Sequence, residues 1–303
     1  MRKKTEEDMK TFEQVDKTAI LEETLARLKS LYEREGIGPG TLVKIGLKPG
    51  WTVVVGTKGE CGTAFRFSGP HKVYEGHQVD LEILKRFVGR NLMDVVSESI
   101  GSALIPIRSV AVAAMSALSQ PFLSADSLAK RGLRIWDDQS LLESVITPHD
   151  VVTLIGYGGM VQNVMGRCKE LHVADMRPRE SLLTTMIGEE IEYEPRRLTL
   201  HGPEEDEALL GRSDVVIITA SSLINRTFDD LIKYASHARV LGLYGPSASI
   251  IPDVLFEHGI DFIMSHHVIN PQKFIDSIVN DMNMESALRK YQRYQVMLPA
   301  NGV

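Results

Sequence analysis

Cysteine is scarce in this sequence. Among 303 residues there are only two, Cys61 and Cys168, and they form neither a CxxC motif nor a cluster with histidine. A framework of disulfides is therefore excluded, and a reducing compartment is the expected environment. The nine histidines show no HxH or HExxH spacing, which argues against a preformed structural metal site.

Long hydrophobic runs are also missing. No segment approaches the roughly 18 apolar residues that a membrane-spanning helix needs, and the most apolar helical stretch, Val110–Leu118, is too short. The N-terminal segment Met1–Lys17 is charged and has no apolar centre, unlike a secretory signal. These features predict a soluble, cytoplasmic protein with no membrane partner.

The sequence has no surplus of positive charge. Its formal net charge is −6, whereas nucleic-acid binding requires an excess of Lys and Arg to contact phosphates. We therefore expect no nucleic-acid partner. The composition is otherwise that of a folded protein, with 43% hydrophobic and 24% charged residues. The length suffices for two domains, each with its own core.

The N-terminal part, residues 1–125, is predicted to be an α+β domain. Apolar residues at helical spacing predict a helix over Thr18–Glu35. Two β-rich runs bounded by turns follow, Leu42–Val55 and Cys61–Phe67, and their short loops predict an antiparallel meander. The turn signal Pro49-Gly50 interrupts the first run, which can therefore form two strands. Further helical spacing then predicts helices over Val79–Val88, Leu92–Ser99 and Ile107–Leu118.

The C-terminal part, residues 126–303, shows strands that alternate with helices. Such alternation predicts an α/β domain built on a Rossmann-like parallel sheet. The expected strands are Val151–Ile155, Leu171–Ala174, Asp214–Thr219, Arg239–Tyr244 and Asp261–Met264. The expected helices are Met160–Lys169, Phe228–Ala235, Ile250–His258 and, as one or two helices, Lys273–Met297.

Glycines follow the first strand of this sheet at Gly156, Gly158 and Gly159. Glycines at this place allow a tight turn and the approach of an anion to backbone amides, and Asp175 after the second strand could hold a ribose hydroxyl. However, Val161 stands where a GxGxxG motif has its third glycine. A dinucleotide site and a simple tight turn therefore both stay open.

Small polar residues follow the next two strands. Hydroxyl and amide groups can hydrogen-bond a polar ligand without adding charge, or they can cap the next helix. Because the carboxyl ends of parallel strands meet at one edge of the sheet, we expect a ligand site there. The candidates are Thr219, Ser221, Ser222 and Asn225 after one strand, and Gly245, Pro246 and Ser247 after the other.

Two other polar features have an ordinary structural interpretation that competes with a functional one. His266 follows the last predicted strand and is a candidate metal ligand or proton carrier, although a lone surface histidine is the commoner outcome. The acidic run Glu204–Glu207 is interpreted as a solvated helix start.

The spaced features of the C-terminal part resemble those of the putative heavy-metal chelatase family. These features are Thr219, Ser221, Asn225, Thr227, Gly245-Pro246-Ser247, Pro252 and Gly259-Ile260-Asp261. Trp51, Gly59–Phe65 and Ala111–Ser119 fit the family's N-terminal half, although Ser116 replaces its usual Asn and Gly158-Gly159 replace bulkier residues. The resemblance implies an enolase-like N-terminal domain, a Rossmann-like C-terminal domain, and a site in the cleft between them.

Three functions stay open at this point. The leading hypothesis is a protein that binds a small polar or metal-chelating ligand in the interdomain cleft. A chelatase activity is an open option, with His266 and Asp175 as the candidates to exchange a metal or a proton. The alternatives are a Rossmann-type enzyme that uses a nucleotide or S-adenosylmethionine, and a non-catalytic sensor or scavenger. The cofactor is unknown, with a divalent or heavy metal as one candidate, and a homo-oligomer is one option for assembly.

Overall fold

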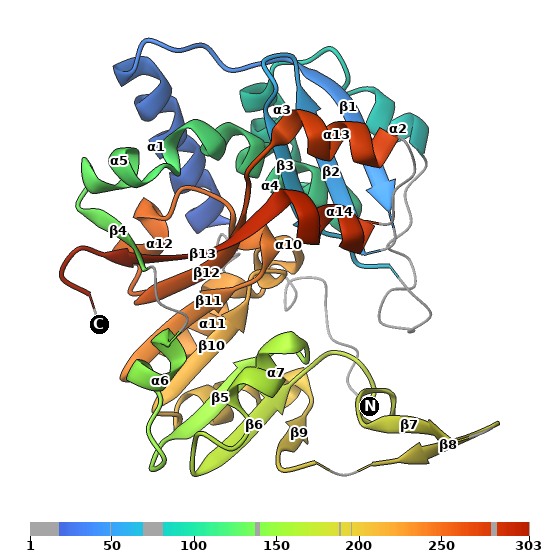
Figure 1. Cartoon of the computed structure of the whole chain (residues 1–303), viewed down its shortest axis with the longest axis vertical. Helices are drawn as coiled ribbons and strands as arrows, with labels where there is room; N and C mark the ends of the chain where they lie inside the picture. The colour runs from blue at the N-terminus through green and yellow to red at the C-terminus, as the bar shows by residue number, and fades with distance from the viewer. Residues whose placement is uncertain are drawn as a thin grey trace, which may run out of the picture.

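A computed structural model describes residues 18–48, 50–68, 81–136, 140–187, 189–194, 196–279 and 284–302. The N-terminal segment Met1–Lys17 and the start of the predicted helix Val79–Val88 lie outside these residues. The described chain forms one large and mostly parallel sheet, a small antiparallel sheet and surrounding helices (Figure 1). This arrangement confirms the predicted α/β fold class.

The large sheet has eight strands in the order β4-β13-β12-β11-β10-β5-β6-β9. Strands β12 to β9 along this order are parallel, and β13 and β4 run antiparallel to the strands beside them. The bounds are β4 (Leu133–Trp136), β5 (Val151–Ile155), β6 (Glu170–Ala174), β9 (Thr199–His201), β10 (Val215–Thr219), β11 (Val240–Tyr244), β12 (Phe262–Val268) and β13 (Gln292–Pro299). All five predicted strands are present, as β5, β6, β10, β11 and β12.

Strand β10 shows why these runs become central strands. Val215 and Ile217 belong to one hydrophobic cluster, whereas Val216 and Ile218 belong to another. All four side chains are fully buried. Because successive side chains point to opposite faces, a run that is apolar at every position can be buried on both faces only inside a sheet covered on both sides.

The small sheet contains β1 (Leu42–Lys48), β2 (Trp51–Gly56) and β3 (Cys61–Phe65), paired as the predicted antiparallel meander. Helix α4 (Ile105–Ser119) packs closely on β3 at Gly62. A Cβ atom at Gly62 would lie 2.0 Å from the carbonyl oxygen of Ala113, so only glycine permits this approach. The hydrophobic cluster under α4 continues to Ile218 of β10, which joins the two parts of the chain in one core.

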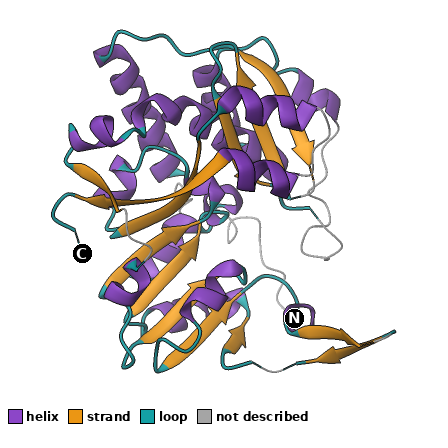
Figure 2. Cartoon of the chain, viewed as in Figure 1, coloured by secondary structure: helices purple, strands orange, loops and turns teal. Residues whose placement is uncertain are grey.

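Helices cover both sheets (Figure 2). Helices α2 (Leu81–Lys85) and α3 (Leu92–Ser99) lie on the side of the small sheet, and α1 (Ala19–Arg34) packs on α3, α4 and α12 (Asp253–Glu257). The other helical segments are η3 (Gln120–Phe122), α5 (Ala125–Ala129), α6 (Leu141–Val145), α7 (Gly159–Val164), α8 (Arg179–Leu182), η4 (Pro203–Glu205), α9 (Asp206–Leu210), α10 (Ser222–Asn225), α11 (Phe228–Tyr234) and η5 (Pro246–Ala248). Across the described ranges, no helix combines the length and the apolar character that a membrane span requires.

The C-terminal end differs from the prediction of helices up to Met297. Helices α13 (Pro271–Val279) and α14 (Met284–Tyr291) form, and they lie in front of the small sheet in Figure 1, where Phe274 and Ala287 join a cluster with Cys61. Strand β13 then enters the large sheet between β12 and β4. The prediction was wrong for this strand because pairing with β12, a distant segment, outweighs the local helical spacing.

Other strands were not predicted. These are β4 and β9 at the two edges of the large sheet, and β7 (Thr184–Ile187) and β8 (Glu190–Tyr193), which pair as a separate two-stranded ribbon that projects from the body (Figure 1). Strand β12 is also longer than expected, so His266 lies within a strand and not in a loop after it. The domain division between residues 125 and 126 stays a prediction.

Candidate functional site

A cavity of about 300 Å³ lies at the carboxyl ends of β5, β6, β10 and β11. Segments that follow each of these strands line it, and Phe65 and Phe67 at the end of β3 complete it from the small sheet. Pro203 and Asp206, near the edge strand β9, and Leu231 of α11 also contribute. The cavity therefore lies where the two sheets meet, at the sheet edge where ligands bind in open α/β folds.

The structure brings most of the predicted ligand-binding residues together in this cavity. The lining includes Gly156, Gly158, Asp175, Thr219, Ser221, Ser222, Asn225, Gly245, Pro246 and Ser247. Gly159 is not part of the lining and begins helix α7. That these residues contact a ligand stays a prediction.

Gly156 is required by local packing. Its φ of +95° lies in the region that favours glycine. A Cβ atom there would lie 2.9 Å from Cγ2 of Thr219. The Tyr244 hydroxyl donates a hydrogen bond to the Gly156 carbonyl oxygen at 2.9 Å, so this turn is held against β10 and β11. The glycine needs no ligand to explain it.

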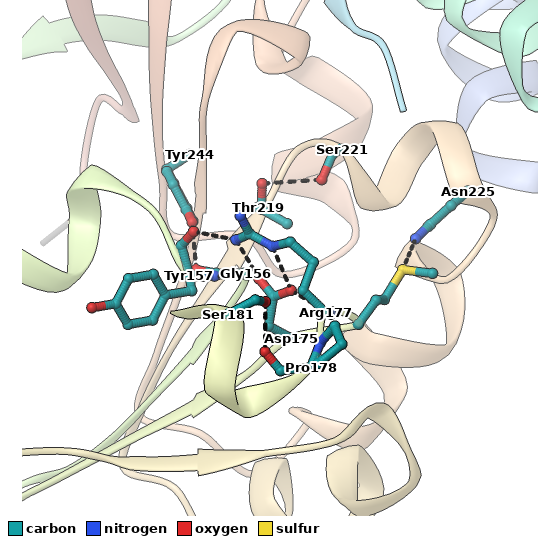
Figure 3. A network of polar contacts seen from close by, with 11 residues as sticks. Gly156, Tyr157, Asp175, Arg177, Pro178, Ser181, Thr219, Ser221, Asn225 and Tyr244 are labelled. Atoms are coloured by element: carbon teal, nitrogen blue, oxygen red, sulfur yellow. Dashed lines mark hydrogen bonds and ion pairs between the residues drawn. The ribbon is translucent and has the colours of Figure 1, made fainter. Parts of the chain in front are cut away.

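Both carboxylate oxygens of Asp175 accept hydrogen bonds from neighbouring residues (Figure 3). Oδ2 accepts from the Tyr157 amide at 2.7 Å and from Nη2 of Arg177 at 2.9 Å. Oδ1 accepts from the amide and from Nε of Arg177 at 2.8 and 3.0 Å. Burial alone would raise the pKa of Asp175, but these hydrogen bonds outweigh it and hold the pKa below its usual value. The Asp175 carboxylate is therefore already neutralised by an ion pair with Arg177.

The hydroxyl and amide groups near β10 divide into two kinds. The Ser222 hydroxyl donates to the carbonyl oxygen of Thr219 at 2.6 Å, and Oδ1 of Asn225 accepts from the amide and hydroxyl of Thr227 at 3.2 and 2.8 Å. These are local side-chain contacts, but neither caps a helix, because α10 and α11 have no side-chain cap hydrogen bond. The hydroxyls of Thr219 and Ser221 contact each other at 3.2 Å, at the cavity wall (Figure 3).

Ser247 joins the two sheets. Its side chain is buried, and its hydroxyl accepts a hydrogen bond from the Phe65 amide at 2.8 Å. Gly245 before it has a φ of +112°, a conformation that favours glycine. The turn after β11 is therefore hydrogen-bonded to the end of β3, and both residues of this contact line the cavity.

His266 is not part of the cavity lining. Its ring packs edge to face on Tyr294 of β13, with ring centroids 5.8 Å apart. Burial lowers its pKa, and its Nδ1 is buried with no hydrogen-bond partner in the described part of the chain. Among those residues, no group of three or more His, Cys, Asp or Glu is placed to hold a metal ion. The structure thus does not join His266 to Asp175.

Asp206 lines the cavity, although the acidic run around it was interpreted as a solvated helix start. Glu204, Glu205 and Glu207 are exposed as expected, but Asp206 is half-buried. Burial, and then the charge of Glu204, raises its pKa to about 6. The sequence signal that could have shown this is weak: Leu209 and Leu210, three and four residues later, are buried on the same short helix.

This fold and cavity define an α/β protein with a small-molecule-sized cavity between a mostly parallel sheet and an antiparallel meander. The chain belongs to the DUF364 family, described as "Putative heavy-metal chelation", whose profile matches residues 140–297. The family resemblance inferred from the sequence is thereby confirmed.

Two crystal structures share the fold over most of the chain, and a further relative matches in sequence. A crystal structure of a DUF364 protein from Desulfitobacterium hafniense DCB-2 is 17% identical, with a TM-score of 0.63 over 89% of this chain and 97% of that one. One from Pyrococcus horikoshii is 19% identical, with a TM-score of 0.62 over 90% and 98%. An uncharacterized protein of Methanocaldococcus jannaschii is 24% identical over 226 residues, covering 72% of this chain and 76% of that protein.

Proposed function

We propose that this protein binds a small metal-chelating molecule in the cavity between its two sheets. The observation that carries the proposal is the convergence of segments following four strands of the large sheet with Phe65 and Phe67 of the other part. A volume of about 300 Å³ lies at the lower end of the range for small-molecule pockets. The family description, heavy-metal chelation, agrees with a ligand of this class.

The lining suits a molecule with an apolar body and several polar groups. Phe65, Phe67 and Leu231 supply apolar surface, and the rings of the two phenylalanines meet edge to face at 5.0 Å. Thr219 and Ser221 supply hydroxyl groups that can donate or accept. Few but well-placed polar groups in a mainly apolar pocket are typical of small-molecule sites.

A nucleotide or S-adenosylmethionine is the less favoured ligand. In that hypothesis Asp175 would accept a hydrogen bond from a ribose hydroxyl. Its two oxygens already accept four hydrogen bonds, from Tyr157 and Arg177, so a ribose would first have to displace Arg177. A chelatase and a non-catalytic sensor or scavenger would use the same cavity, and turnover of a bound chelate distinguishes between them.

The test is native mass spectrometry of the purified chain, which reports any small molecule or metal that remains bound. The variant Ser221→Trp places a large side chain at the cavity wall, and Ser236→Trp is the control because Ser236 is exposed beyond α11. We expect a bound mass in the wild type and in Ser236→Trp and its loss in Ser221→Trp. Equal occupancy in both variants would place the ligand elsewhere and refute the proposal.

A further inference from the structure

The cavity contains one carboxyl group that no positive charge in the described ranges compensates. Asp206 lines the cavity from the start of α9, and its Oδ1 is buried without a hydrogen-bond partner among the described residues. The other charged residues of the lining, Asp175 and Arg177, form an ion pair at 2.9 Å. Among the charged residues of the described lining, Asp206 is therefore the one that no opposite charge neutralises.

An uncompensated carboxyl group in a half-buried place is unfavourable for the fold. Burial disfavours its charged form, and for this reason the pKa of Asp206 rises to about 6, with a further contribution from the charge of Glu204. Above that pH the group is ionised and still lacks a partner among the described residues. Buried charges are normally paired, and a perturbed carboxyl group in a cleft is a candidate functional group.

Strand β9 of the large sheet holds Asp206 in position through its neighbour Glu205. Nδ1 of His201 donates to the Glu205 carboxylate at 2.9 Å, because a carboxylate can only accept when ionised. Nε2 of His201 in turn contacts Nδ1 of His172 at 3.1 Å. This series of contacts, from His172 of β6 through His201 of β9 to Glu205, anchors the residue directly before Asp206. The carboxyl group is thus held at the cavity by the surrounding structure.

We propose that Asp206 is the specificity-determining residue of this cavity and pairs with a positively charged group on the ligand. The proposal rests on the function proposed above and adds the chemistry of the ligand. The positive group is either a divalent metal ion or an organic ammonium, since both bind a single carboxylate. The apolar body of the ligand faces Phe65 and Phe67, and its neutral polar groups meet the hydroxyls of Thr219 and Ser221.

Two probes of nearly equal shape test the pairing. Phenethylamine carries an ammonium group, and phenethyl alcohol is its neutral counterpart. At about pH 8, where Asp206 is ionised, calorimetric titration of the wild type should show the amine binding about tenfold or more tightly than the alcohol, since a charge-assisted hydrogen bond is worth about 1.5–3 kcal/mol. Asp206→Asn should lose this preference and keep its affinity for the alcohol. Glu207→Gln, an exposed neighbour on the same helix, should keep both.

A third titration identifies the source of the charge. Co²⁺ alone is added, and its visible absorption is followed in the wild type and in Asp206→Asn. Binding that disappears in Asp206→Asn identifies a metal ion, and an amine preference without Co²⁺ binding identifies an ammonium. The proposal is overturned if the wild type prefers neither cation, or if Asp206→Asn retains the preference while its circular dichroism spectrum is that of the wild type.

The same titrations separate this inference from the proposed function. If phenethyl alcohol binds, and Ser221→Trp blocks it, the cavity is a small-molecule site whatever the result for Asp206. Equal affinities for the amine and the alcohol would then refute only the role of Asp206. If neither probe nor Co²⁺ binds the wild type, both proposals fail.

Discussion

Replacing Asp206 with Asn should stabilise the ligand-free protein at neutral pH. The carboxyl group is half-buried without a partner in the described residues, and its pKa rises from 3.8 to about 6. A rise of about two pKa units corresponds to about 3 kcal/mol, since one unit is about 1.4 kcal/mol. We treat this as an upper bound because solvent screens the exposed part of the group. Asn has nearly the same shape and carries no charge.

The sign of the pH dependence follows from the raised pKa. The folded state binds the proton of Asp206 more tightly than the unfolded state does. The favourable contribution is therefore complete below about pH 4 and is lost as the pH rises through about 6. The stability advantage of Asp206→Asn should accordingly be near zero at about pH 4 and largest above about pH 7. Other titrating groups, which are present in both proteins, cancel in the difference.

The assay is urea unfolding of both proteins at a series of pH values, which gives the difference in the free energy of unfolding. Glu207→Gln is the control and should show no such trend, whereas Glu204→Gln should reduce it, because the charge of Glu204 contributes to the raised pKa. A difference that does not vary with pH, or an Asn variant less stable than the wild type at about pH 8, would show that Asp206 has a partner or is well solvated.

Three further substitutions test the contacts around the cavity. Gly156→Ala should cost about 1–3 kcal/mol in urea unfolding, because its φ is +95° and the new Cβ would meet Thr219; an unchanged midpoint would contradict the packing. Ser247→Ala should cost about 1–3 kcal/mol by leaving the β3 amide unpaired, and a thermal scan that matches the wild type would exclude this. Arg177→Met should raise the pKa of Asp175 and lose stability of about 1–3 kcal/mol above about pH 4. This loss should shrink as the pH falls through the lowered pKa of Asp175, and ¹³C NMR of its carboxyl group would report the pKa directly.

The central strands could be predicted because their signal is local. In β10, every residue from Val215 to Ile218 is apolar and buried, so the run itself indicates a strand covered on both faces. The convergence of the loops after β5, β6, β10 and β11 follows from parallel topology alone. The sequence therefore predicts that residues such as Thr219 and Ser221 lie close together, and both line the cavity.

Strand β13 could not be predicted from the same kind of signal. Its apolar residues Val296, Met297 and Leu298 form a short run that is compatible with a buried helix or a strand. The choice depends on pairing with β12, where Met297 lies opposite Ile263. Such a pairing joins segments far apart in the sequence, so no local pattern contains it.

By itself the sequence determined the α/β class, the order of the central strands along the chain and the polar loops at their carboxyl ends, because these depend on periodicity and on short-range chemistry. Only the tertiary structure decided which carboxyl group is compensated. Asp175 is paired with Arg177, whereas Asp206 lines the cavity with one oxygen buried and unpartnered in the described part of the chain. The physical reason is that the state of a charge depends on burial and on the groups that face it, and these are set by segments that meet only in the folded chain.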